Sequence, residues 1–272
     1  MADRDYIGRT TGLPPTVESL ARDLVALGLR PGLVVLVHSS LSALGWVAGG
    51  APAVVEALTQ VLGPDGTLVM PTHSSDLSDP AGWVAPPVPA AWHEHLRAHM
   101  PAFDAATTPT WTMGAVPESF RTHPGVVRSA HPRQSFAARG RQAHVVTAGH
   151  ALDCAMGERS PLARICDLDG SVLLLGVGHD RNTSLHLAEH RATFPAKKHA
   201  RFGSPVQVDG TRRWLVVEDL DFDDSDFADV GAAFERETTD VMTGRVGYGT
   251  GRLMRQRALV DFAARWMTAN RT

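Results

Sequence analysis

Apolar residues recur at helical spacing near the start of the chain and then form a short continuous run. In residues 16–27 they fall on one helical face, with Thr16 suited to cap the helix and Gly28 suited to end it. The next apolar run, residues 33–37, has the length and character of a buried central strand. The apolar helical face comprises Val17, Leu20, Leu24 and Leu27.

The same strand begins a strand–helix–strand unit. Residues 33–37 run directly into His38-Ser39-Ser40, a helix is predicted over 51–62, and a second strand over 67–70 runs into Thr72-His73-Ser74. Such a unit favours a right-handed parallel crossover, which brings both strand ends to one edge of a sheet. Ligands of α/β sheets bind at that edge, so the two polar clusters are expected to lie side by side there.

Residues 171–191 predict another strand, loop and helix. The apolar run 172–175 precedes a Gly-bearing turn, and Asn182 or Thr183 can cap the helix that follows. On this helix His186, Glu189 and His190 are spaced i, i+3 and i+4, so they share a face. A parallel strand here would carry His186 to the same sheet edge, although a solvated polar face gives the same spacing.

The remaining pattern completes an α/β fold. Frequent prolines between about residues 76 and 110 predict an insertion over the binding edge, with a short helix over 92–99. Residues 205–217 predict a hairpin around Asp209-Gly210, and the stretches 226–240 and 253–267 predict closing helices. We expect one domain over 1–272, a three-layer α/β/α fold with a mostly parallel central sheet, the Pro-rich insertion and a C-terminal hairpin-helix region.

Two charged stretches admit more than one interpretation. The basic stretch 126–142 is either a phosphate-binding element or a solvated strand edge. The acidic stretch 218–229 is a solvated loop or an acidic wall for a cationic ligand, because it lacks the turn glycine and terminal glutamate of a calcium loop. The basic stretch contains Arg128, His131, Arg133, Ser135, Arg139 and Arg141.

Composition narrows the class of protein. The chain of 272 residues is 43% hydrophobic, which is enough for a full core, and its net charge of −3 argues against nucleic-acid binding. No apolar run could span a bilayer, and the N-terminal residues lack signal-peptide character. Cys154 and Cys166 are too few for a disulfide framework. We therefore expect a cytoplasmic protein that binds no membrane.

Several common catalytic motifs are absent, including the Gly-x-Ser-x-Gly elbow, the Walker loop and the dinucleotide fingerprint. The segment from His186 to His190 matches the H-x-x-E-H pattern of zinc hydrolases, but no third ligand stands out. Alternatively, His186 is a general base oriented by Glu189. Without an evident nucleophile, direct transfer between two bound substrates is favoured over a covalent intermediate.

Long segments, in the same order as in that family, resemble the aminoglycoside 3-N-acetyltransferase family. They are LVALGLRPGLVVLVHSSLSALGWVAGG, LGPDGTLVMPTHSSDLSDP, WVAPPVPAAWHEHLRAHMPAFD, SAHPRQSFAARG, SPLARICDLDGSVLLLGVGHDRNTSLHLAEHRA and GRLMRQRALVDFAARW. The resemblance implies transfer of acetyl from acetyl-CoA to the 3-amino group of 2-deoxystreptamine antibiotics, and hence resistance. It makes His186 the base and Glu189 its orienting partner, with His38 assisting. His190 lies outside the pattern, so no metal is expected.

The resemblance also implies binding roles. Main chain and hydroxyls of Ser39, Ser40 and Ser42 would hold coenzyme A, Thr72 would steady the thioester carbonyl, and His131 and Ser135 would line the coenzyme A side. A polycationic acceptor calls for an acidic groove, for which the candidates are Asp76, Glu94, Asp180, Glu218 and Asp219. A different amine acceptor, or a protein that only sequesters cationic ligands, stays open, as does a monomer or a homodimer.

Overall fold

A computed structural model describes residues 5–272, so residues 1–4 of the N-terminal segment discussed above lie outside the described part. Its centre is a seven-stranded sheet in the order β3-β4-β2-β1-β5-β9-β8, and a separate two-stranded sheet pairs β6 with β7. The strands are β1 (Val34–Ser39), β2 (Thr67–Pro71), β3 (Val127–Arg128), β4 (Phe136–Gly140), β5 (Ser171–Leu175), β6 (His199–Val208), β7 (Thr211–Leu220), β8 (Val241–Val246) and β9 (Gly249–Arg255).

The predicted parallel crossover forms the middle of the sheet. Leu36 of β1 is in register with Val69 of β2 and with Val172 of β5, and both pairings are parallel. On either side, β4 pairs antiparallel with β2, and β9 pairs antiparallel with β5. The parallel part is thus the central three strands, and antiparallel strands complete a mixed sheet.

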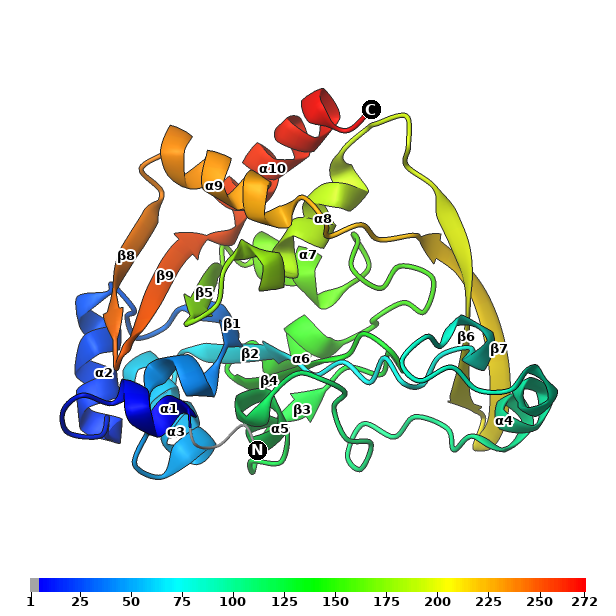
Figure 1. Ribbon diagram of the computed structural model, residues 1–272, viewed down its shortest axis with the longest axis horizontal. Coiled ribbons are helices and arrows are strands. Elements are labelled where there is room, and N and C mark those ends of the chain that lie inside the picture. Colours follow the sequence, from blue (N-terminus) through cyan, green and yellow to red (C-terminus); the bar gives the residue numbers. More distant parts are fainter. Residues whose placement is uncertain (1–4) are drawn as a thin grey trace.

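Helices cover both faces of the sheet, which confirms the three-layer architecture (Figure 1). Alternate residues of β1 point to opposite faces, so Val35 packs into one buried cluster with α2, α3 and α5, and Leu36 packs into another with α6 to α10. The α-helices are α1 (Asp5–Arg9), α2 (Val17–Ala26), α3 (Gly50–Leu62), α4 (His93–His99), α5 (Ala115–Arg121), α6 (Ala143–Thr147), α7 (Pro161–Asp167), α8 (Ser184–Arg191), α9 (Phe227–Glu237) and α10 (Gln256–Asn270).

Side-chain caps fix two of the predicted helix starts. Thr16 and Ser19 form a reciprocal capping box at the start of α2. At the start of α8 the Asn182 Oδ1 accepts a hydrogen bond from the Ser184 amide at 3.2 Å, whereas Thr183 makes no side-chain cap. Asn182 is therefore the residue whose side chain caps the helix that carries His186.

The predicted helix over 253–267 is wrong at its start. Residues 253–255 belong to β9, and α10 begins only at Gln256. The side chains of Leu253 and Met254 are buried in the sheet, and the Gly-rich stretch 247–251 forms the turn and first part of the β8–β9 hairpin. Glycines in this stretch interrupt the alternation of apolar and polar residues that would have indicated strands.

The insertion packs on the predicted hairpin, which is longer than expected. The Arg212 guanidinium of β7 donates to the Met100 carbonyl at 2.9 Å, and the Phe103 amide donates to the Pro205 carbonyl at 3.1 Å. Figure 1 shows α4 beside the ends of β6 and β7, away from the central sheet. Among residues 5–272, none of the helices combines the length and apolar character that crossing a membrane requires.

Candidate active site

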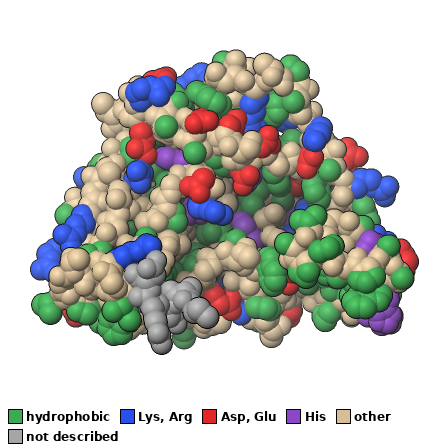
Figure 2. Space-filling model, viewed as in Figure 1, with side chains coloured by type: hydrophobic (Ala, Val, Ile, Leu, Met, Phe, Trp, Pro, Cys, Tyr) green, Lys and Arg blue, Asp and Glu red, His purple; other side chains and the backbone are tan. Residues whose placement is uncertain are grey.

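The carboxyl ends of β1, β2 and β5 open into a cavity of about 880 Å³. Ser39 ends β1 and Ser40 follows it, His73 lies just beyond the end of β2, and the turn 176–178 follows β5, so the three predicted clusters converge at one edge. Residues 112–115, which lead into α5, also line the cavity. Figure 2 shows the molecule hollowed near its centre, with Asp and Glu side chains gathered mainly on the upper side of the hollow.

His186 and Glu189 form a hydrogen-bonded pair on α8. The His186 Nδ1 lies 3.0 Å from the Glu189 Oε2, and the two side chains are 13% and 1% exposed. A carboxylate only accepts, so the imidazole donates from Nδ1, and in the neutral imidazole the lone pair is then on Nε2. The rings of Phe222 and Phe227 pack on the imidazole, each 4.8 Å between centroids. The geometry suits a general base whose tautomer is fixed by its carboxylate.

The Glu189 carboxylate is buried but fully partnered. Its Oε1 accepts from the Arg271 guanidinium at 2.8 Å and from the Asp223 amide at 2.8 Å, while Oε2 accepts from His186. A buried carboxylate without such partners would be strongly disfavoured. Sequence inspection gave Arg271 no role, since one arginine near the end of a helix carries no recognisable pattern.

His38 and His73 are buried neutral groups at the cavity. Burial, with a smaller effect of His186, lowers the pKa of His38 to about 3, and its Nε2 lies 3.3 Å from the Thr183 hydroxyl. Burial likewise lowers the pKa of His73 to about 3, although a hydrogen bond to the Ser135 carbonyl opposes the shift. Because that carbonyl accepts from Nδ1, His73 Nε2 is unprotonated, and it has no partner among the described residues.

His73 was not assigned a role from the sequence. The only signal for it in the sequence was its place near the end of a predicted strand, which it shares with His38. His190 lies apart from the pair, with Nε2 3.8 Å from the Asp219 Oδ1. Within residues 5–272, no three His, Cys, Asp or Glu side chains are grouped so that they could hold a metal ion.

Of the residues predicted to bind coenzyme A, some line the cavity and the others are buried behind its lining. Ser39, Ser40 and Ser42 line the cavity, and the Ser40 and Ser42 hydroxyls lie 3.2 Å apart. Thr72 and Ser135 are fully buried next to the rim, where the Ser135 hydroxyl donates to the Thr72 carbonyl at 2.8 Å.

His131 is also buried, and its Nδ1 accepts from the Arg133 and Gln134 amides at 3.2 and 3.0 Å. The surface of the cavity contains none of Thr72, His131 and Ser135. These three residues therefore support the rim from within the protein.

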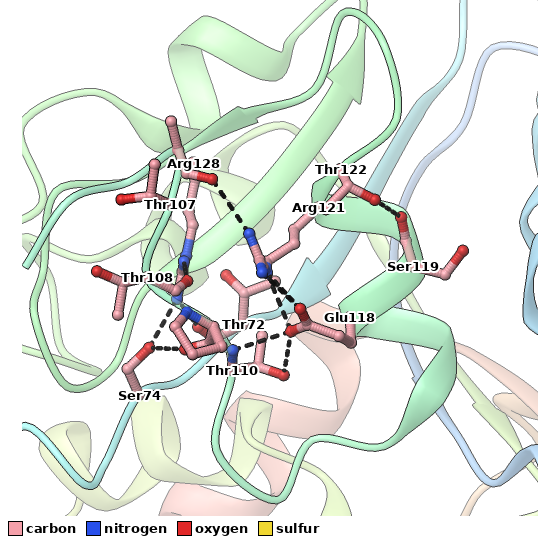
Figure 3. Close-up of polar contacts among 12 residues, drawn as sticks. Thr72, Ser74, Thr107, Thr108, Thr110, Glu118, Ser119, Arg121, Thr122 and Arg128 are labelled. Atoms are coloured by element: carbon pink, nitrogen blue, oxygen red, sulfur yellow. Dashed lines mark hydrogen bonds and ion pairs between the residues drawn. The ribbon is translucent and has the colours of Figure 1, made fainter.

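Arg128 ties this rim to Thr108, in the segment that leads to residues 112–115 (Figure 3). Its guanidinium donates to the carbonyls of Thr72 and Thr108, to the Ser74 hydroxyl at 2.9 Å and to the Ser135 hydroxyl at 3.0 Å. Burial lowers the pKa of Arg128 to about 10, so the group stays charged at neutral pH. Arg128 is therefore neither part of a phosphate site nor a residue of a solvated strand edge, because its hydrogen-bond donors are used inside the protein.

The predicted acidic residues are dispersed. Only Asp180 lines the cavity, where it pairs with Arg181 at 3.2 Å. Glu94 is an exposed partner of Arg97 in the insertion, and Glu218 is exposed on β7.

The other two carboxylates are less accessible. Asp219 is 2% exposed and accepts from the amides of Ala155 and Leu220, both at 2.8 Å. Asp76 is half-buried, and its Oδ1 has no partner among the described residues. The structure thus does not gather the five carboxylates into one groove.

Comparison with protein families places these features in context. The family model described as aminoglycoside 3-N-acetyltransferase matches residues 36–268. The chain is 44% identical over 265 residues to the SPbeta prophage-derived aminoglycoside N(3')-acetyltransferase-like protein YokD of Bacillus subtilis, covering 97% of this chain and 96% of that protein. It is 39% identical over 270 residues to aminoglycoside N(3)-acetyltransferase VII of Streptomyces paromomycinus, covering 93% and 92% of the two chains.

Solved structures of similar proteins also superpose on this chain. The crystal structure of YokD superposes with a TM-score of 0.95 at 43% identity, covering 98% of each chain. AAC-IIIb, solved as a binary complex with CoASH, superposes with a TM-score of 0.84 at 33% identity over 94% of this chain and 97% of that one. AAC-VIa bound to sisomicin has a TM-score of 0.85 at 33% identity, covering 96% of this chain and 100% of that one.

Proposed function

Because the chain belongs to the aminoglycoside 3-N-acetyltransferase family, we propose that it transfers acetyl from acetyl-CoA to the 3-amino group of 2-deoxystreptamine aminoglycosides and thereby confers resistance. The observation that supports this best is the His186–Glu189 pair on the helix that starts at the cavity. The CoASH complex of AAC-IIIb and the sisomicin complex of AAC-VIa support the two substrate classes.

His186 is the general base in this proposal. Its Nε2 takes a proton from the 3-amino group while the amine nitrogen forms a bond to the acetyl carbonyl carbon. The thioester C–S bond then breaks, and the coenzyme A sulfur receives that proton back from His186. The sum is an amide and free coenzyme A, with no net proton gained by the protein. Glu189 keeps Nδ1 protonated, so Nε2 is the basic atom at the start of each cycle.

The cavity rim supplies the groups that coenzyme A needs. Ser39, Ser40 and Ser42 offer hydroxyls and main-chain groups at the end of β1, and we place the pantetheine and pyrophosphate there. Thr72, His131 and Ser135 contribute by holding the rim in place. His38 stays neutral at the pH of the reaction because burial keeps its pKa at about 3, so it positions substrate as an uncharged imidazole.

A second acceptor class has a specific observation in its favour. Asp180 is the only carboxylate that lines the cavity among the described residues, and Arg181 already pairs with it. A less highly charged amine would also fit such surroundings.

An acceptor screen separates the two. The protein is incubated with acetyl-CoA and either gentamicin, apramycin, sisomicin, a diamine or an aryl amine, and the release of free thiol is followed. The proposal expects turnover with the aminoglycosides and an NMR signature of acetylation at N-3. Turnover confined to the simple amines would replace it with the second class, and absence of turnover with every acceptor would refute both.

A further inference from the structure

Arg271 lies on the side of Glu189 that faces away from His186. The Arg271 Nη1 is 2.8 Å from the Glu189 Oε1, and the Glu189 Oε2 is 3.0 Å from the His186 Nδ1. The carboxylate therefore bridges a guanidinium and an imidazole that lie 85 positions apart in the sequence, from residue 186 to residue 271. All three side chains are largely buried, with 9%, 1% and 13% exposed for Arg271, Glu189 and His186.

We propose that Arg271 is a positioning residue for acetyl transfer, which holds the Glu189 carboxylate so that it fixes the Nδ1–H tautomer of His186. The inference rests on the proposed function, in which His186 is the base. Arg271 touches neither substrate in this account and acts only through Glu189.

The hydrogen bonds of Glu189 explain why a cation is needed. Its Oε1 has two donors, the Arg271 guanidinium and the neutral Asp223 amide. Among the described residues, Arg271 is the only arginine or lysine in ion-pair contact with this carboxylate. Without it, a nearly inaccessible anion would be left with one amide and the imidazole, which favours either proton sharing with His186 or rotation of the carboxylate.

Arg271 is itself held in a fixed position. Its Nε and Nη2 donate to the two Asp226 carboxylate oxygens at 2.8 and 2.6 Å, and Nη2 also donates to the Asp223 carbonyl at 2.8 Å. The Phe194 ring lies beneath the guanidinium at 5.1 Å. Burial alone would lower the pKa of Arg271, but the hydrogen bonds to Asp226 and Glu189 raise it. A planar, permanently charged fork suits this bidentate geometry better than an ammonium group does.

The test compares Arg271→Gln and Arg271→Lys with Arg255→Gln as control. Arg255 precedes α10, and its ion pair with Asp169 is exposed, so its loss leaves the site untouched. We expect kcat of Arg271→Gln to fall by about 10- to 100-fold, as for other partners that orient a reacting group, with KM for both substrates unchanged. Arg271→Lys should recover part of the loss, and Arg255→Gln should match the original protein.

A second readout does not depend on turnover. Long-range ¹H–¹⁵N spectra report which imidazole nitrogen of His186 carries the proton. The Nδ1–H form should dominate in the original protein, and Arg271→Gln should show a mixture of tautomers.

Unchanged kcat or an unchanged tautomer in Arg271→Gln would overturn the inference. If the original protein lacks acetyl transfer altogether, the proposed function fails, and the spectra still decide whether Arg271 controls His186. If Arg271→Gln does not fold, the same two measurements are made on Arg271→Lys. A kcat equal to that of the original protein, together with a spectrum in which the Nδ1–H form still dominates, would then overturn the inference.

Discussion

The His38 Nε2 lies 3.3 Å from the Thr183 hydroxyl, which joins the end of β1 to the turn that starts α8. Thr183 in turn accepts the His186 amide at its carbonyl, 3.1 Å away. The end of β1 and the start of α8 are therefore connected through two hydrogen bonds. This connection joins two residues that line the cavity, His38 and Thr183, to the helix of His186, although 148 positions separate the two histidines, from residue 38 to residue 186.

Two buried histidines should make the stability depend on pH. The pKa values of His38 and His73 are about 3 in the folded protein, below the value of about 6.5 expected when unfolded. The unfolded chain thus binds more protons between pH 6.5 and 3, so the free energy of unfolding falls as the pH falls through this window. Each histidine contributes a slope of up to about 1.4 kcal/mol per pH unit. Urea denaturation at several pH values measures this dependence of the free energy of unfolding on pH.

His73→Asn provides the comparison. Asparagine can still donate to the Ser135 carbonyl, but it does not titrate in this range. Its unfolding free energy should depend less steeply on pH than that of the original protein between pH 6 and pH 4. Equal slopes for the two proteins would show that His73 is not held neutral by the fold.

Removal of the Arg128 guanidinium should loosen the rim. Arg128→Met leaves the Thr108 carbonyl without its donor and removes one of the two donors to the Thr72 carbonyl, and a buried unsatisfied group costs about 1–3 kcal/mol. Residues 112–115 line the cavity just beyond Thr108, so KM for acetyl-CoA should rise as well. Urea denaturation and steady-state kinetics measure the two effects.

Arg141→Met is the matched control for that prediction. Arg141 pairs with Asp65 at 3.3 Å, and both side chains are mostly exposed, so its loss should change stability by less than about 0.5 kcal/mol. An Arg128→Met protein as stable as Arg141→Met would contradict the supporting role of the buried arginine.

Asp180 and Glu94 should differ in their effect on acceptor binding. Asp180 lines the cavity, whereas Glu94 lies in the insertion and pairs with Arg97. Asp180→Asn should raise KM for gentamicin by about two- to fivefold at low salt, the range expected for one exposed charge, and Glu94→Gln should leave it unchanged. A larger rise in KM for Glu94→Gln than for Asp180→Asn would indicate that the acceptor binds nearer the insertion.

The sequence predicted the parts of the site that depend on strand order. Apolar runs before His38 and before Thr72 indicated buried strands, and the parallel crossover then fixed where their ends lie. The spacing of His186 and Glu189 likewise predicted their contact, since it depends only on helix geometry.

Features that depend on tertiary burial could not be predicted in this way. Arg128, Asp219 and Arg271 were indistinguishable in sequence from surface charges, because the groups that satisfy them come from distant segments. The β8–β9 hairpin was missed for a different reason. Its glycines at 249 and 251 pack against neighbouring groups where a side chain would collide, so they interrupt the strand pattern while allowing the strands to pair.

The central claim is that His186 acts as the base, and the kcat of His186→Ala tests it most directly. His190→Ala is the matched control, because His190 is on the same helix but does not contact Glu189 through a hydrogen bond. The account predicts that His186→Ala lowers kcat for acetyl transfer to gentamicin by about 10²- to 10⁴-fold while His190→Ala retains it. A folded His186→Ala protein with the kcat of the original would contradict the account.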